Sequence, residues 1–167
     1  RALRSTSGSP SKAGDTMIKP TVILADDHTL VVEGFQRLLD SHCTLLATVE
    51  DGKALLEAVE AHRPDIVILD ISMPVMNGID AGRALSARYP DLKLVYVTMH
   101  ADPAYIKAAF QAGASAYILK RSLGEELTQA LRTVLKGHTY VTPLIARDVI
   151  DGMLKQDSNP GAAQVEL

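Results

Sequence analysis

The chain has little cysteine, lacks tryptophan and carries no excess of positive charge. Its 167 residues include a single cysteine, Cys43, and no tryptophan. An internal disulfide is therefore excluded, and a reducing compartment is expected. The sequence has 17 Lys and Arg against 20 Asp and Glu, a formal net charge of -3. This balance leaves no basic excess to neutralise a phosphate backbone, so the chain alone is a poor candidate for DNA binding.

Long hydrophobic runs are also absent. No apolar run approaches the roughly 18 residues that a bilayer span requires, and the N-terminus lacks the apolar core of a signal peptide. We therefore expect a cytoplasmic protein with no membrane partner. Residues 1–16, rich in Ser, Gly, Pro and Lys, are predicted to be a disordered leader, native or added, before Met17.

What the sequence does contain is a regular alternation of short aliphatic runs with amphipathic stretches. The runs fall at residues 21–25, 45–49, 66–69, 94–98 and 116–119. Continuous apolar runs of this length are typical of parallel strands that are buried on both faces. The pattern predicts one α/β domain with a five-stranded parallel sheet covered by helices on both sides.

Several residues mark where the intervening helices begin. Ser122 with Glu125 forms a capping-box pattern, and Asp102 and Thr142 each precede a proline. Residues 143–155 form an extra C-terminal amphipathic helix, whose apolar positions are Ala146, Val149, Ile150, Met153 and Leu154. The segment 156–167 that follows is predicted to be a flexible linker.

Polar residues gather at the ends of the predicted strands. They are Asp26 and Asp27 after the first strand, Asp70 after the third, Thr98 at the end of the fourth and Lys120 after the fifth. Open parallel sheets bind ligands outside the carboxyl ends of their strands. Each residue alone is most often a turn former, a strand residue or solvated surface, so the prediction rests on the whole set.

Three neighbouring aspartates repel one another unless positive charge intervenes. Mg2+ fits, because it prefers oxygen ligands and retains water. The cluster offers no thiolate or histidine set for zinc, and His28 is expected to face solvent. A carboxylate, a magnesium ion, Lys120 and the Thr98 hydroxyl meeting at one point could accept a phosphoryl group.

Four motifs in order, "LADDH", "PDIVILDISMPVMNG", "VTMHAD" and "GASAYILKRS", make the chain similar to the receiver domain of two-component response regulators, and to the NarL/FixJ subfamily in particular. The resemblance covers residues 17–142 and implies a flavodoxin-like (βα)5 fold. It also implies a signalling switch that takes a phosphoryl group from a sensor histidine kinase or a small donor. Such a domain promotes its own phosphorylation and dephosphorylation but has no separate turnover substrate.

The resemblance assigns roles to individual residues. Asp70 would be the phosphoacceptor and Lys120 its cationic partner. Asp26, Asp27 and Asp70 would hold Mg2+ together with the backbone carbonyl of Ser72.

The resemblance also implies a switch. Thr98 would donate its hydroxyl to the phosphoryl group and draw in its loop, and Tyr117 would then turn from exposed to buried. Ser72 and His100 occupy positions that influence phosphoryl lifetime in this family. Arg121 stands where many receivers have proline, so no cis bond is expected there.

Members of the subfamily continue into a helix-turn-helix domain, whereas this sequence stops near where that domain would begin. We therefore expect a receiver and its linker helix, cut from a transcription factor that binds DNA only through the missing domain. Pairing of two copies on phosphorylation is implied as well.

Three alternatives remain open at this point. The parent protein could be a stand-alone receiver that acts through protein contacts. A phosphatase with an aspartyl nucleophile is less favoured, because such enzymes carry D-x-D at the first strand. A flavin-binding module would need a hydroxyl-rich phosphate loop after the first strand, where "DDH" would repel phosphate without a metal.

Overall fold

The computed structural model describes residues 19–157, and its centre is a parallel sheet. The strands β1 (Thr21–Ala25), β2 (Thr44–Val49), β3 (Ile66–Leu69), β4 (Lys93–Thr98), β5 (Ala116–Leu119) and β6 (Tyr140–Val141) lie in the order β2-β1-β3-β4-β5-β6. All neighbouring strands are parallel. The predicted leader 1–16 and residues 158–167 of the predicted linker lie outside the described residues.

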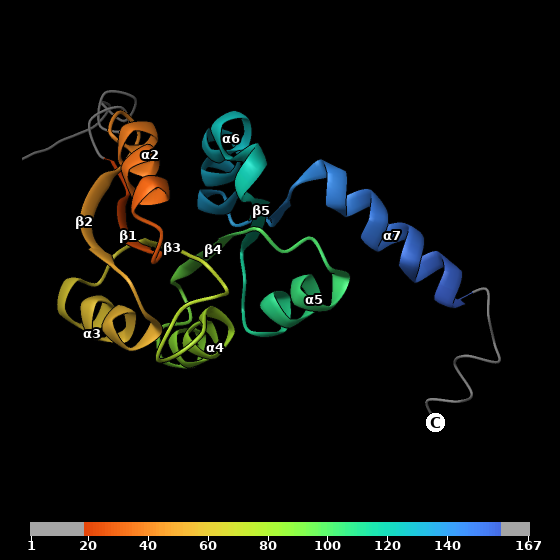
Figure 1. The fold of residues 1–167 in the computed structure, drawn as a ribbon, viewed down its shortest axis with the longest axis horizontal. Coiled ribbons are helices and arrows are strands. Elements are labelled where there is room, and N and C mark those ends of the chain that lie inside the picture. Colours follow the sequence, from red (N-terminus) through yellow and green to blue (C-terminus); the bar gives the residue numbers. More distant parts are fainter. Residues whose placement is uncertain (1–18, 158–167) are drawn as a thin grey trace, which may run out of the picture.

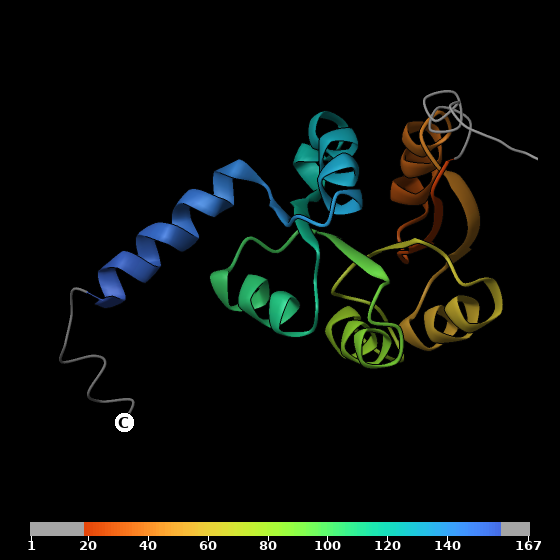
Figure 2. The ribbon, with the colours of Figure 1, turned by 180° about the vertical axis from the view of Figure 1, so that it is seen from behind.

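Helices cover both faces of this sheet. Helices α2 (Thr29–Leu39) and α6 (Leu123–Leu135) lie on one face, and α3 (Gly52–His62), α4 (Gly78–Arg88) and α5 (Pro103–Gln111) lie on the other (Figures 1 and 2). Along β1, Val22 and Leu24 pack into the core under α2 and α6, whereas Ile23 and Ala25 pack toward α3 to α5. Because both faces are covered there, β3 and the last four positions of β1 are apolar throughout.

The predicted fold class is confirmed, and one strand must be added to it. The five predicted strands agree with the structure to within one residue at each end. The sixth, β6, pairs with β5 through Tyr140 N to Ser115 O at 3.1 Å and Thr142 N to Tyr117 O at 2.9 Å. A two-residue strand has no periodicity of its own, so only its neighbour reveals it.

The helix starts follow the sequence in part. Asp102 caps α5, since its side chain accepts a hydrogen bond from Ala104 N at 2.8 Å. The capping box at Ser122 was wrong, because a 3-10 turn over Lys120–Ser122 leads into α6 and Ser122 makes no side-chain cap bond. The described backbone contains no cis peptide bond, as expected from Arg121.

Helix α7 (Pro143–Asp157) extends two residues beyond its predicted end and projects away from the sheet (Figure 1). Only its first turns pack on the domain, through the buried Ile145 and the half-buried Val149. The other large apolar side chains of the predicted face, Ile150, Met153 and Leu154, are 55–62% exposed. Among the described residues, no helix is long and apolar enough to cross a membrane.

Candidate functional site

The polar residues at the strand ends meet as the topology predicts. β1 and β3 are neighbours, and Asp70 N donates to Ala25 O at 3.1 Å, so Asp26 and Asp70 emerge side by side. Lys120, after β5, reaches both of them. Its Nζ atom lies 2.9 Å from Asp26 Oδ2 and 2.9 Å from Asp70 Oδ2. The structure therefore joins three distant segments of the chain through one ammonium group.

Two of these carboxylates are almost completely withdrawn from water. Asp26 is 2% and Asp70 is 3% exposed. Backbone amides compensate part of the charge, because Ile71 N donates to Asp70 Oδ1 at 2.7 Å and His28 N donates to Asp26 Oδ1 at 2.9 Å. Buried charges need such partners, since an unpaired buried carboxylate is strongly unfavourable. The site thus holds its carboxylates in fixed orientations.

Positive charge in the site falls short of the negative charge. Burial alone would lower the pKa of Lys120, but hydrogen bonds and charge attraction from Asp70 and Asp26 outweigh it, so the pKa is raised above its usual value. Lys120 is therefore a permanent cation at neutral pH. With Asp27 included, three carboxylates face one ammonium, which leaves about two negative charges for a further cation to offset.

His28 is exposed, as the sequence predicts, and it also contacts the acidic cluster. Its side chain is partly exposed, yet Nδ1 lies 2.9 Å from Asp26 Oδ1 and 3.3 Å from Asp27 Oδ1. The same atom is 3.2 Å from Lys120 Nζ. The imidazole is exposed as predicted, and what the sequence did not predict is its contact with the two carboxylates.

The loop after β4 is tied to its surroundings through His100. Thr98 is fully buried, and its hydroxyl accepts a hydrogen bond from His100 N at 3.3 Å. Tyr117, also fully buried, donates its hydroxyl to His100 O at 2.7 Å. The His100 ring stacks on Tyr105 at 4.4 Å and meets Ser72 Oγ at 2.8 Å through Nε2.

Tyr117 therefore occupies the inward position that the sequence analysis associated with the switched state. Burial, followed by the negative charges of Asp70 and Asp102, raises the pKa of Tyr117 well above its usual value. Its hydroxyl consequently remains a neutral hydrogen-bond donor. The hydroxyl oxygen of Thr98 in turn accepts a hydrogen bond from His100 N in its own loop.

Gly78 is a site residue that the sequence analysis missed. A Cβ atom there would overlap the backbone carbonyl oxygen of Asp70. Gly78 N also donates to Ile71 O at 2.8 Å, and Asn77 caps α4 by accepting from Asp80 N at 2.8 Å. Only glycine allows the start of α4 to lie this close to Asp70. The signal was available, as "NG" ends the motif that contains Asp70.

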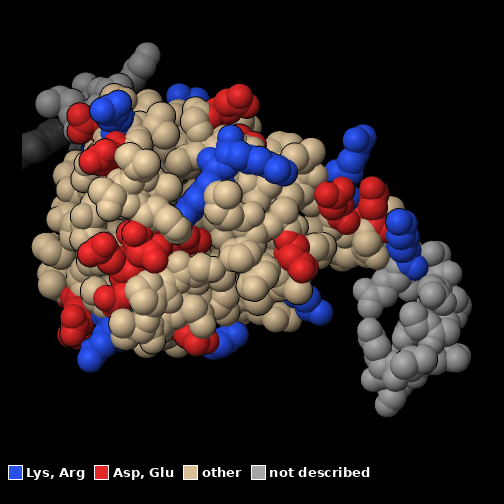
Figure 3. Space-filling view, viewed as in Figure 1, with Lys and Arg blue, Asp and Glu red and all other residues tan. Residues whose placement is uncertain are grey.

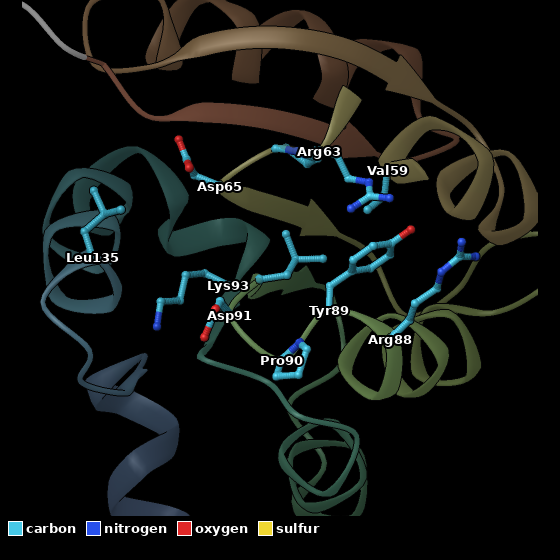
Figure 4. A pocket seen from close by; sticks show the side chains of 11 residues that line it. Val59, Arg63, Asp65, Arg88, Tyr89, Pro90, Asp91, Lys93 and Leu135 are labelled. Atoms are coloured by element: carbon cyan, nitrogen blue, oxygen red, sulfur yellow. The ribbon is translucent and has the colours of Figure 1, made fainter. Parts of the chain in front are cut away.

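Two hollows flank the domain at opposite edges. One, of about 600 Å³, adjoins the acidic cluster and is lined in part by Asp27, Ser72 and Tyr105. The other, of about 470 Å³, lies at the amino ends of the strands (Figure 4), where the guanidinium groups of Arg63 and Arg88 lie 4.9 and 5.4 Å from the centre of the Tyr89 ring. Of these two hollows, the first is the one that adjoins the acidic cluster of Asp26, Asp27 and Asp70.

The surface charge agrees with the composition. On the face drawn in Figure 3, Lys and Arg side chains are interspersed with Asp and Glu and do not form one continuous basic patch.

The fold and site together define a doubly wound α/β protein with an acidic, lysine-bearing site compatible with a divalent cation at the carboxyl edge of its sheet.

Comparison with known families makes this class specific. Residues 22–132 match the family model described as response regulator receiver domain. The chain belongs to that family, whose members are receivers in two-component signalling and not metabolic enzymes. Its relatives are regulators of the NarL/FixJ subfamily, so the recognition made from the four motifs is confirmed.

Among curated proteins, the chain is 36% identical over 134 residues to the transcriptional regulatory protein DegU of Brevibacillus brevis, covering 79% of this chain and 57% of DegU. It is 37% identical over 138 residues to the oxygen regulatory protein NreC of Staphylococcus epidermidis, covering 81% and 63%. The chain therefore spans about three fifths of the length of these relatives.

Solved structures agree in fold. A LuxR-family two-component response regulator from an Aurantimonas species superposes with a TM-score of 0.78 at 31% identity, covering 82% of this chain and 99% of that one. The RcsB response regulator of Salmonella typhimurium gives a TM-score of 0.73 at 26% identity, covering 78% of this chain and 69% of that one.

Proposed function

We propose that this receiver is a phosphorylation switch and that Asp70 is its phosphoacceptor. The observation that carries the proposal is the 2.9 Å contact between the buried Asp70 carboxylate and Lys120 Nζ at the end of β3. This contact provides a fixed nucleophile with a cation beside it. Phosphoryl transfer depends mainly on such positioning and on neutralisation of charge.

The reaction itself needs little further chemistry. An Asp70 oxygen attacks the phosphorus of a sensor kinase phosphohistidine, and the phosphorus–nitrogen bond breaks with its electron pair left on the donor imidazole. An acyl phosphate on Asp70 results. Lys120 attracts the phosphoryl oxygens, and the Thr98 hydroxyl, whose oxygen accepts from His100 N, keeps its hydrogen to donate to them.

The donor set fits Mg2+. Asp26 and Asp27 with Asp70 bring three carboxylates within 4.8 Å of one another, and the Ser72 carbonyl is the proposed fourth protein ligand. The Lys120 ammonium bonded between Asp26 and Asp70 is itself evidence that these atoms attract a cation. When bound, the ion neutralises charge on the transferring phosphoryl group.

The conformational change that follows phosphorylation is proposed from the contacts of His100 with Thr98 and Tyr117. Thr98 and Tyr117 are both hydrogen-bonded to the backbone of His100. A shift of Thr98 toward a phosphoryl group would therefore move the loop after β4 and alter its contact with Tyr117. Such a local charge event can shift a population between two packings. Pairing of two copies is supported by the RcsB relative, which has been seen as dimers bound to DNA.

We propose that the full-length protein is a transcription regulator. Residues 17–142 would be the receiver, 143–155 the start of the linker helix α7, and 156–167 a link to a helix-turn-helix domain. DegU is named a transcriptional regulator and is longer than this chain, which supports this assignment over a stand-alone receiver. The coding sequence beyond Leu167 distinguishes the two.

Intact-mass measurement tests the phosphoacceptor. With Mg2+ and acetyl phosphate, the protein should gain one phosphoryl group, and Asp70→Asn should gain none. Asp148→Asn, an exposed aspartate on α7, is the matched control and should be modified like the wild type. Equal modification of the Asp70 variant would overturn the assignment, and transfer that persists in a chelator would overturn the role of the metal. Turnover of a phosphomonoester would instead favour a phosphatase.

A further inference from the structure

We infer that Thr142 couples the phosphorylation state of the site to the direction of helix α7. The inference rests on the proposed function and concerns how that switch acts on the rest of the protein. Thr142 lies between β6 and α7 and is fully buried. Its backbone amide and its hydroxyl bond to β5, and its carbonyl bonds to α7.

The first support is the pair of hydrogen bonds that fasten Thr142 to β5. Thr142 N donates to Tyr117 O at 2.9 Å, and Leu119 N donates to Thr142 Oγ1 at 3.1 Å. In a continuing parallel ladder, Leu119 N would donate to the carbonyl of residue 142. That carbonyl instead accepts from Ala146 N at 3.0 Å within the first turn of α7, so the hydroxyl takes its place. The start of α7 is therefore bonded to the carboxyl end of β5 through a side chain.

The second support is what the same end of β5 holds at the site. The Tyr117 hydroxyl donates to His100 O at 2.7 Å. Lys120, the residue after Leu119, donates to the proposed phosphoacceptor at 2.9 Å. In the proposed switch both contacts change, because the phosphoryl group attracts Lys120 and the loop after β4. Since Thr142 is close-packed and bonded to Tyr117 and Leu119, it has to move with them.

The third support is that α7 packs on the domain at its base. Ile145 belongs to the same buried cluster as Tyr117, and Val149 packs against that cluster. The later part of α7 projects away from the sheet (Figure 1). A helix of 15 residues spans about 22 Å, so a rotation of about 10° at its base moves its far end by about 4 Å. A small displacement of Thr142 is thus enlarged along α7, toward the domain that the full-length protein is proposed to carry.

The distance between two spin labels tests the inference. The labels are attached to Glu57→Cys on α3 and Asp151→Cys on α7, both exposed positions, in a Cys43→Ala background. Double electron–electron resonance measures the distance with and without Mg2+ and acetyl phosphate, and intact mass gives the phosphoryl content of each sample. With Thr142 in place, phosphorylation should change the mean distance by about 2 Å or more, because Asp151 lies about halfway along α7.

Substitutions at Thr142 separate coupling from phosphorylation. Thr142→Ser keeps the hydroxyl and should keep the change in distance. Thr142→Val keeps the shape of the side chain but removes the acceptor of Leu119 N, so it should gain the phosphoryl group and lose the change in distance. Thr133→Val removes a hydroxyl that donates to Gln129 O inside α6. It is the matched control and should keep the change.

The coupling and the proposed function fail in different ways. If the samples gain the phosphoryl group and Thr142→Val changes its distance as the wild type does, or if the phosphorylated wild type shows no change, the inference is overturned and the proposed phosphoacceptor stands. If no sample gains the group, the proposed function is overturned, and the inference with it. If Thr142→Val does not fold, amide NMR of the wild type decides. The signals of Leu119 and Thr142 should move on phosphorylation, and unchanged signals would overturn the inference.

Discussion

Substitutions at Gly82 and Tyr96 test how closely α4 packs against β4, next to the candidate site. Tyr96 is completely buried, and its hydroxyl donates to Gly78 O at 2.7 Å. A Cβ at Gly82 would overlap that hydroxyl oxygen and lie 3.2 Å from the ring carbon that bears it. Replacing a helical glycine by alanine normally stabilises by about 1 kcal/mol. Here Gly82→Ala should destabilise instead.

The magnitude follows from what the new methyl group displaces. Overpacking a buried site costs about 1–3 kcal/mol, and forcing the hydroxyl away from Gly78 O leaves the buried Tyr96 hydroxyl without its acceptor, for about 1–3 kcal/mol more. After the usual gain of about 1 kcal/mol for Gly→Ala in a helix is subtracted, the net loss should be about 1–5 kcal/mol. Tyr96→Phe alone should lose about 0.5–1.5 kcal/mol, the net value of one hydrogen bond, because the Gly78 carbonyl keeps its partner within the helix.

The double variant separates these contributions. Because Tyr96→Phe already removes the hydroxyl, adding Gly82→Ala should cost at least about 1 kcal/mol less than it does in the wild type. Urea unfolding followed by circular dichroism measures all three variants. Gly34→Ala in α2, where nothing lies within 4 Å of the new Cβ, is the control and should stabilise. Stabilisation by Gly82→Ala, or additivity within about 0.5 kcal/mol, would refute the reasoning.

Three further predictions concern other parts of the chain. Arg63 ends α3 with φ of 48°, so Arg63→Gly should raise the thermal midpoint despite losing its contact with Tyr89, and a lower midpoint would contradict this. Burial raises the pKa of Cys43 from 9.0 to about 11. At pH 8 its reaction with a disulfide reagent should therefore be roughly 100-fold slower than that of a thiol whose pKa is 9.0. An equal rate for the two thiols would contradict this. Burial and a hydrogen bond to Glu126 raise the pKa of Tyr140 to about 12. The unfolded chain therefore ionises first, and the stability advantage over Tyr140→Phe should hold below pH 10 and shrink between pH 10 and 12; a constant difference in unfolding free energy would exclude this linkage.

The parts of the fold that the sequence predicted are those with a one-dimensional signal. β1 and β3 read as continuous apolar runs because both faces of the sheet are covered, and Asp102 before a proline is a local cap. β6 and the turn at Ser122 were not predictable in this way. β6 depends on its pairing with β5, from which helix α6 separates it along the chain, and the 3-10 turn shares its residues with an ordinary helix start.

The same distinction between local sequence signals and tertiary contacts applies to the candidate site. The rule that ligands lie at the carboxyl ends of parallel strands predicts from the sequence alone that Asp26, Asp70 and Lys120 lie together. It did not place His28, because the direction of that ring depends on a hydrogen bond from its backbone to Asp26. Nor did it indicate that the Thr98 hydroxyl would be engaged by His100.

The shortage of positive charge in the site connects its stability to its proposed chemistry. Asp26 and Asp70 are buried beside one ammonium group and remain under-compensated when Asp27 is counted. Like charges held this close oppose folding, and a rigid sheet with neighbours on both sides of β1 and β3 can hold them together nonetheless. In the proposed function, a bound divalent ion would relieve the repulsion, and a phosphoryl group on Asp70 would renew it. The proposed metal binding and phosphorylation would therefore both act on the same charge imbalance, which opposes folding when it is uncompensated.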